Sequence, residues 1–408
     1  MRDDWNAGLS TEDAGLAHAI LGLCLRRWGS LSAWHTSRLN RPSRGIPVET
    51  QIALNIGLSQ LAWLPGVASH AAVDESVSLV SISKTSFPPH KGLVNAMLRS
   101  AASDRKKLAL ELDSMPQGLD RQPFLERMVQ AALGDRFTDR NAAILQDMLL
   151  QPPSLAFVVL SGDAPECLMP DSQFKQAWRI RPGAQFPTAW LRSGAGMVQD
   201  ISSQALMGFD WHFEKPESMR ILDVCAAPGG KTTALAKRWP SAKIFALENH
   251  PARAKRLRDN LAARKVNAQV EEAESIAWIR RGGRPFDLIL LDAPCSASGT
   301  IRKHPELNWI GDYSDIGRLA SIQRDLLSTA ISRLSSGGLL IYSVCSWFQE
   351  EGIGHIASLQ SSNPEIKPAP VWPSSQTTDA QDSDRTHLFL PDPLVWDGEG
   401  FQGFAVTR

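Results

Sequence analysis

Two cysteines in this sequence stand where predicted buried strands end. Cys295 lies in Asp292-Ala293-Pro294-Cys295-Ser296 after the apolar run 286–291, and Cys345 follows the run 337–341 and also precedes a serine. A cysteine thiolate is the nucleophilic form of this side chain and can also exchange protons. A single cysteine is more often a small buried hydrophobe, but two that follow strands in this way indicate a pair with a chemical role.

A third segment of this kind runs through Asp223, Val224, Cys225, Ala226, Ala227, Pro228, Gly229, Gly230, Lys231 and Thr232. From about residue 216 onward, strand and helix patterns alternate, which predicts βαβ units and a parallel sheet. The carboxyl ends of parallel strands meet at one edge of a sheet. We therefore expect the three cysteines at 225, 295 and 345 to line one crevice.

The glycine loop in the third segment predicts a nucleoside site. It fails the P-loop pattern because position 225 is not glycine, and it lacks G-x-G-x-x-G, so no dinucleotide is expected. Glu248 ends the next strand, 243–247, where an acid can bond the hydroxyls of a ribose. Glu274 follows a further short apolar stretch and is placed to face an adenine edge. A nucleoside site without a phosphate cradle fits S-adenosylmethionine, and the alternative is a tight turn without a ligand.

Polar residues beside Cys295 indicate how a base and its backbone would be held. Asp292 is the first residue past an apolar strand, so its carboxyl group can hydrogen-bond the polar edge of a base. Arg302, Lys303 and His304 follow the Cys295 loop, where a nucleic-acid backbone would approach. The basic run 253–265 is as readily explained as a solvated helix face.

The composition limits the class of protein. Lys plus Arg (43) equal Asp plus Glu (43), and this neutral balance mildly disfavours a nucleic-acid binder. The five cysteines are scattered without a C-x-x-C pair, so we expect no metal site and no disulfide framework. No apolar run approaches the roughly 20 residues of a membrane helix, and the polar start lacks a signal-peptide core. We expect a soluble, cytoplasmic protein that binds no membrane.

The patterns along the 408 residues predict three domains. Residues 1–125 are predicted to be helical, beginning at the capping box formed by residues 10–13. Residues 126–215 are predicted to form a small α+β subdomain with a strand at 155–160. Residues 216–408 are predicted to form the α/β domain that carries the motifs.

These motifs together resemble the RNA cytosine-5 methyltransferases of the Nop2/Sun class. The resemblance is carried by the segment 223–232, by 292–296 with Gly299, and by 342–346 followed by Glu350 and Glu351. Within that class, the loop 301–306 with Trp309 looks most like the bacterial small-subunit rRNA branch, the RsmB (Fmu/Sun) type. The segment 91–99 is similar to the NusB-like RNA-binding domain that this branch carries at its amino end.

The resemblance implies a Rossmann-like class I methyltransferase domain behind an all-α NusB-like domain. It implies that S-adenosylmethionine is held by 225–231, Glu248, Glu274 and Asp292. It also implies that Cys345 attacks C6 of a cytosine in small-subunit rRNA, that C5 then accepts the methyl group, and that Cys295 assists release. Asp292 would stabilise the base protonated at N3. The family suggests a monomer.

The attack requires a thiolate, so we expect the site to lower the pKa of Cys345. Two alternatives remain open. In a DNA cytosine-5 methyltransferase the Pro-Cys thiol, here Cys295, would be the nucleophile, and a tRNA enzyme would share the motifs. A non-catalytic RNA-binding assembly factor is permitted by Val344, which stands where the family usually has threonine, and by the two glutamates at 248 and 274.

Overall fold

The computed structural model describes residues 8–39, 46–82, 90–172, 174, 176–214, 216–372, 387–391 and 397–408. The chain divides into two units, Met1–Glu126 and Arg127–Arg408. Each unit has its own hydrophobic core, so each is described separately.

The first unit is helical, as its apolar spacing predicts. Its helices are α1 (Thr11–Arg26), α2 (Trp28–Thr36), α3 (Val48–Trp63), α4 (Ser69–Ile82), α5 (Lys91–Ala102) and α6 (Arg105–Asp113), followed by the short η2 (Gln117–Asp120). The predicted helix start is confirmed, because Ser10 is the N-cap of α1 and its hydroxyl oxygen accepts the Asp13 N–H at 3.0 Å. Leu54, Leu58 and Leu98 are fully buried in the core that these helices share.

The second unit begins with helices and a small sheet. The boundary falls within α7 (Pro123–Leu133), which η3 (Gly134–Arg136) and α8 (Asp139–Leu149) follow. Four short antiparallel strands then pair in the order β2-β3-β1-β4, with bounds Ala156–Val159 (β1), Leu168–Pro170 (β2), Trp178–Ile180 (β3) and Gly196–Val198 (β4). Helix α9 (Thr188–Arg192) precedes β4, and α10 (Ile201–Leu206) follows it.

The larger sheet of the second unit has the strand order β10-β12-β9-β8-β5-β6-β7, and β11 pairs with β12. The bounds are Arg220–Val224 (β5), Lys243–Glu248 (β6), Gln269–Glu272 (β7), Phe286–Asp292 (β8), Leu334–Val344 (β9), Lys367–Pro368 (β10), Leu388–Phe389 (β11) and Gln402–Thr407 (β12). The strands from β7 to β9 are parallel, whereas β12 pairs antiparallel with β9. This confirms the predicted parallel sheet.

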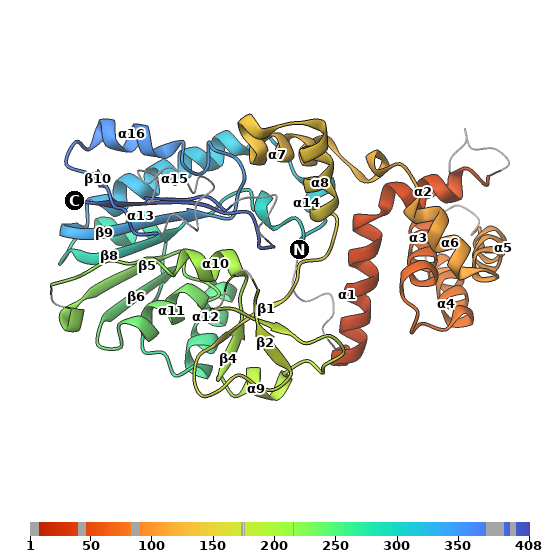
Figure 1. Cartoon of the computed structure of the whole chain (residues 1–408), viewed down its shortest axis with the longest axis horizontal. Coiled ribbons are helices and arrows are strands. Elements are labelled where there is room, and N and C mark those ends of the chain that lie inside the picture. Colours follow the sequence, from red (N-terminus) through yellow and green to blue (C-terminus); the bar gives the residue numbers. More distant parts are fainter. Residues whose placement is uncertain are drawn as a thin grey trace. The chain divides into compact units, whose positions relative to one another are not determined.

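Helices cover both faces of this sheet (Figure 1). The remaining bounds are η4 (Pro216–Ser218), α11 (Gly230–Arg238), α12 (Pro251–Ala263), α13 (Ser275–Arg280), η5 (Ser298–Thr300), α14 (Leu307–Ile310), α15 (Asp315–Ile331) and α16 (His355–Ser362). Side chains alternate along each strand, so Ile221 packs in the core on the α11 face while Leu222 packs against the α13 and α15 face. Both faces are buried, which explains why the strands are almost uniformly apolar.

Candidate active site

The carboxyl edge of the large sheet collects the three strand ends that the sequence singled out, and we call this edge the crevice because ligands of open α/β sheets bind there. The chain runs from β5 outward to β7 and then returns to place β8 on the other side of β5. This reversal is a topological switch point, where ligands of open α/β sheets bind. Cys225 follows β5, Cys295 follows β8 and Cys345 follows β9, and these three strands are neighbours.

The two predicted catalytic thiols face one another. Cys295 Sγ lies 3.5 Å from Cys345 Sγ, and both side chains are half-buried. The prediction of a lowered Cys345 pKa is wrong. The contact with Cys295, then burial, and then the nearby carboxylates of Asp292 and Glu399 raise the pKa of Cys345 well above its ordinary value. Before substrate enters, Cys345 is therefore a protonated thiol.

Asp292 is held beside this thiol pair by contacts to both of its oxygens. Its Oδ2 lies 2.7 Å from Lys231 Nζ, and its Oδ1 accepts the Ser343 hydroxyl at 2.8 Å. Burial lowers the pKa of Lys231, but the charge of the Asp292 carboxylate and its hydrogen bond outweigh this effect, so the net pKa is raised. The Lys231 ammonium is thus a fixed positive charge next to the crevice, and it lies 5.2 Å from the centre of the Phe401 ring.

The glycine loop between β5 and α11 brings main chain close to the crevice. Gly229 has a φ of 102°, and a Cβ there would lie 2.8 Å from Leu257. A Cβ on Gly230 would lie 3.2 Å from Gln199 Nε2, so a side chain there would press against Gln199. Cys225 also has a positive φ of 63°. Burial, and then the Asp292 and Glu248 carboxylates, raise the pKa of Cys225 to about 12, so this thiol is not an ionised group.

The two predicted nucleoside-binding acids differ in how they are held. Glu248 is 2% exposed, and its Oε1 accepts the His250 N–H at 3.0 Å. Its Oε2 has no hydrogen-bond donor among the described residues and lies 3.3 Å from the Arg253 guanidinium. An acceptor that takes no hydrogen bond and lies near the Gly229–Gly230 turn fits a nucleoside with ribose hydroxyls. Glu274 is exposed and caps α13, accepting the N–H groups of Ile276 and Ala277 at 3.0 and 2.6 Å.

The predicted basic contact loop is divided between interior and surface. Arg302 is 7% exposed, and its guanidinium donates to Asp397 at 2.8 Å and to the Pro152 carbonyl at 3.1 Å. The guanidinium of Arg302 is therefore already bonded to groups of the protein itself. Lys303 and His304 are exposed.

Residues from distant segments complete the site, and the sequence reading gave them no role. Gly400 N–H donates to the Gly299 carbonyl at 2.8 Å, which brings Glu399 to the crevice. Burial, followed by the Asp200 carboxylate, raises the pKa of Glu399 to about 7, although Lys303 and Lys231 oppose this shift. The only sequence signal for Glu399 is its place in the Gly-Glu-Gly before the last strand.

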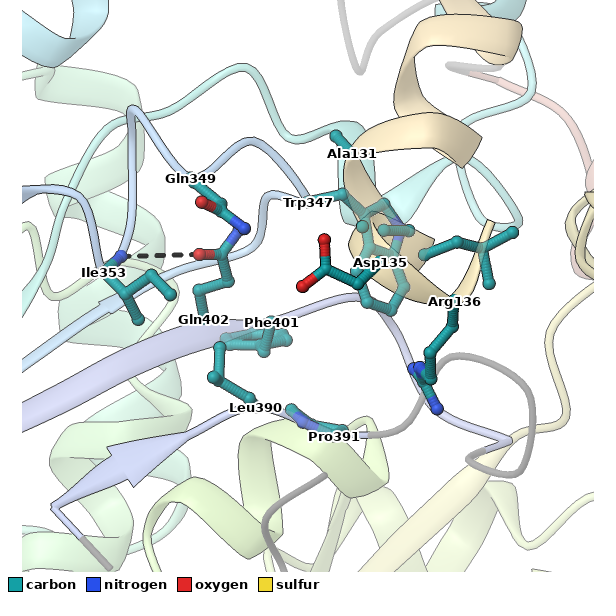
Figure 2. A pocket seen from close by; sticks show the side chains of 13 residues that line it. Ala131, Asp135, Arg136, Trp347, Gln349, Ile353, Leu390, Pro391, Phe401 and Gln402 are labelled. Carbon is teal, nitrogen blue, oxygen red and sulfur yellow. Dashed lines mark hydrogen bonds between the residues drawn. The ribbon is translucent and has the colours of Figure 1, made fainter. Parts of the chain in front are cut away.

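A cavity of about 270 Å³ lies beside the segment that follows Cys345 in the chain (Figure 2). Trp347 and Gln349 line it together with Asp135, Phe401 and Gln402. None of the predicted site residues lines this cavity, so we place the reaction in the crevice at the sheet edge.

The fold and the crevice define a Rossmann-like methyltransferase. The parallel sheet carries a glycine loop after β5, an acid at the last position of β6, and a thiol pair after the neighbouring strands β8 and β9. Among the described residues, no helix has the length and apolar character to cross a bilayer. The described His, Cys, Asp and Glu side chains form no group that could hold a metal ion.

Comparison with known proteins places the chain more narrowly. Residues 212–401 match the family model "16S rRNA methyltransferase RsmB/F", and residues 3–103 match that of the NusB family. Ribosomal RNA small subunit methyltransferase B of Sodalis glossinidius is 32% identical over 88% of this chain and 84% of its own length. The protein of the same name from Serratia proteamaculans is 29% identical over 96% of this chain and 90% of its own length.

Solved structures share the fold. The crystal structure of PH0851 covers 98% of this chain and 92% of its own, with a TM-score of 0.72 and 20% identity. NSun6 from Pyrococcus horikoshii with SFG covers 70% of this chain and 98% of its own, with a TM-score of 0.57 and 16% identity. The chain belongs to the RsmB/F family of 16S rRNA methyltransferases, and its amino-terminal domain belongs to the NusB family.

Proposed function

We propose that this protein methylates C5 of a cytosine in small-subunit rRNA, with S-adenosylmethionine as methyl donor and a covalent cysteine adduct on C6. The observation that carries the proposal is the pair of thiols 3.5 Å apart beside the Asp292–Lys231 ion pair. Two thiols at one base allow one to form the covalent bond and the other to remove a proton. The relatives named as small-subunit rRNA methyltransferases supply the substrate class.

The residues proposed to hold S-adenosylmethionine are the loop 225–231, Glu248, Glu274 and Asp292. When bound, this molecule supplies the methyl group. The Oε2 of Glu248, which accepts no hydrogen bond among the described residues, suits a ribose hydroxyl, and the Gly229–Gly230 turn presents main chain that carries no side chain. Each Glu274 oxygen accepts one N–H of the α13 cap and keeps a second acceptor site with which it could meet adenine. NSun6, one of the structural neighbours, was solved with SFG, an analogue of the methyl donor.

The proposed chemistry assigns one step to each side chain. Cys345 Sγ bonds to C6 as its proton passes through the Asp292 carboxylate to N3 of the base, and Asp292 then stabilises the protonated N3. C5 becomes nucleophilic and accepts the methyl group. Cys295, which has to be a thiolate at this step, then takes the C5 proton, the bond between sulfur and C6 breaks, and the N3 proton returns through Asp292 to the Cys345 sulfur. The target base has to leave its stack to reach both thiols.

A trapping experiment tests these roles. Cys295→Ala protein is incubated with S-adenosylmethionine and small-subunit rRNA, and we expect a protein–RNA adduct on a denaturing gel. The adduct should be missing from the Cys295→Ala/Cys345→Ala double variant. Cys167→Ala is the matched control, because it removes a thiol outside the crevice and should methylate RNA without a trapped adduct. If wild type methylates RNA and Cys295→Ala traps nothing, the two-cysteine assignment is wrong.

The same experiment separates the alternatives. An adduct trapped in Cys345→Ala rather than Cys295→Ala would indicate the cysteine roles of a DNA enzyme. Methyl transfer to tRNA but not to rRNA would change the substrate. A wild-type protein that binds no S-adenosylmethionine in a titration would indicate a non-catalytic assembly factor.

The remaining proposals concern the RNA contacts, the oligomeric state, the location in the cell and the domains. We propose that Lys303 and His304 contact the RNA backbone, while Arg302 supports the loop that carries them. We also propose a monomeric, cytoplasmic enzyme with three domains, 1–125, 126–215 and 216–408.

A further inference from the structure

A buried carboxylate outside the predicted site joins the loops that carry the two thiols. Glu351 is fully buried and lies in the turn between β9 and α16. No ion pair to Glu351 occurs among the described residues. A buried carboxylate without a cation is stable only if hydrogen-bond donors surround it. The identity of those donors shows what this side chain does.

Both oxygens of Glu351 accept hydrogen bonds from the thiol loops. Oε1 accepts the Ser296 N–H at 2.8 Å and the Gln323 amide at 3.2 Å. Oε2 accepts the Ser296 hydroxyl and the Ser346 hydroxyl, each at 2.6 Å. Ser296 directly follows Cys295, and Ser346 directly follows Cys345. One carboxylate therefore holds the neighbour of each thiol.

Further contacts support the same junction. Ser298 Oγ lies 3.0 Å from Ser346 Oγ, and Gln323 also donates to the Pro294 carbonyl at 2.9 Å. On the far side of the turn, Gln402 Oε1 accepts the Ile353 N–H at 3.4 Å, as Figure 2 shows. The turn that presents Glu351 is thus held from both sides.

We propose that Glu351 is a positioning residue that sets the separation of the Cys295 and Cys345 sulfurs. The paired register of β8 and β9 ends at Asp292 and Ser343, so both thiols lie past the last paired residues. Beyond that point one backbone hydrogen bond, from the Gly299 N–H to the Cys345 carbonyl at 3.1 Å, joins the two loops, and Glu351 adds side-chain contacts to both of them, each next to a thiol. Both thiols have to reach one base, and a displacement of about 1 Å can cost about 100-fold in rate. This inference rests on the proposed two-cysteine function.

The test compares three variants by two measurements. Glu351→Ala removes the junction, and Glu351→Gln keeps its shape, because serine hydroxyls can also accept hydrogen bonds from an amide. Glu350→Ala is the matched control, since Glu350 is an exposed carboxylate one residue earlier. The first measurement is kcat and KM for RNA methylation. The second is the rate at which dibromobimane becomes fluorescent by alkylating both thiols, with Cys295→Ala as background.

We expect Glu351→Ala to lower kcat about 100-fold and to slow bimane cross-linking at least about tenfold. KM for RNA should change less than about threefold, because the contacts removed are not to substrate. Glu351→Gln should recover most of both rates, and Glu350→Ala should match wild type. A folded Glu351→Ala protein with wild-type cross-linking and wild-type kcat would overturn the proposal.

A second pair of variants covers the case in which Glu351→Ala does not fold. Ser296→Ala and Ser346→Ala each remove one hydroxyl of the junction, and both should slow cross-linking. Wild-type cross-linking in both would equally overturn the proposal. The cross-linking measurement needs no RNA and no methyl donor. It therefore tests the role of Glu351 even if wild type methylates no RNA, a result that would refute the proposed function instead.

Discussion

Replacing Asp223 with asparagine should remove a large part of the pH dependence of stability. Asp223 is fully buried on β5, and its Oδ2 accepts the Thr232 hydroxyl at 2.5 Å. Its Oδ1 has no hydrogen-bond partner among the described residues. Burial raises the pKa of Asp223 from 3.8 to about 7, with Thr232 opposing the shift and Asp292 adding to it.

The direction of the effect follows from the bound proton. Between about pH 4 and pH 7 the folded protein keeps a proton on Asp223 that the unfolded chain has lost, so the free energy of unfolding falls as pH rises. The fall ends above about pH 7, where both states are ionised. From pH 5 to the folded pKa is roughly 2 units, which at 1.36 kcal/mol per unit corresponds to about 3 kcal/mol. The raised pKa of Glu399 also makes the free energy of unfolding fall as the pH rises. Wild type and Asp223→Asn both contain Glu399, so its contribution cancels when the two proteins are compared.

Urea unfolding of the full chain at pH 5 and pH 8, followed by tryptophan fluorescence, measures this difference. For the transition of the second unit, wild type should lose about 3 kcal/mol more than Asp223→Asn between the two pH values. Asp210→Asn is the control, because its side chain is 78% exposed and its substitution should leave the wild-type pH dependence. Equal losses in wild type and Asp223→Asn would refute the argument that this carboxyl is buried in its protonated form.

Three further predictions concern the crevice. Gly299→Ala places a Cβ 1.9 Å from the Gly400 carbonyl oxygen, so it should destabilise the protein by about 1–3 kcal/mol in thermal unfolding and abolish methylation; wild-type stability would contradict this contact. Because the pKa of Cys345 is raised, iodoacetamide should alkylate this thiol slowly at pH 7 and faster as the pH rises, and Cys295→Ala should speed the alkylation at pH 8. If mass spectrometry finds the same alkylation rate in Cys295→Ala and wild type, Cys295 does not hold the proton on Cys345. Lys303→Ala should weaken RNA binding and reduce its salt dependence by about one phosphate contact, whereas Arg302→Ala should lower the melting temperature because it loses the bond to Asp397. A lower melting temperature for Lys303→Ala and weaker, less salt-dependent RNA binding for Arg302→Ala would exchange their roles.

The sequence by itself determined the architecture and the edge at which chemistry occurs. Apolar runs separated by helical patterns are local signals, and the alternation of strand and helix forces parallel pairing. Parallel strands present their carboxyl ends together, so Cys225, Cys295 and Cys345 had to meet at one edge once the sheet formed. The helical character of the first unit followed from the same periodicity. These features can be predicted because they depend only on residues close together in the sequence and on the handedness of the connections between strands.

The electrostatic state of the thiols was decided by the tertiary structure. The need for a thiolate predicts a lowered pKa for Cys345, but the folded protein raises it. The cause is a sulfur contact and carboxylates brought from strands and loops far apart in the chain. Desolvation depends on how many atoms surround a group, and sequence spacing carries no such information.

The partners of individual polar side chains were likewise decided only on folding. Glu274 matches an acid expected at an adenine edge, yet it caps a helix. Arg302 lies in a basic run, yet its guanidinium is bound to Asp397, 95 residues away. Glu351 joins Ser296 across 55 residues and gave no local signal of its position. A sequence pattern fixes which face or edge a residue occupies, but hydrogen-bond partners are set where segments distant along the chain pack together.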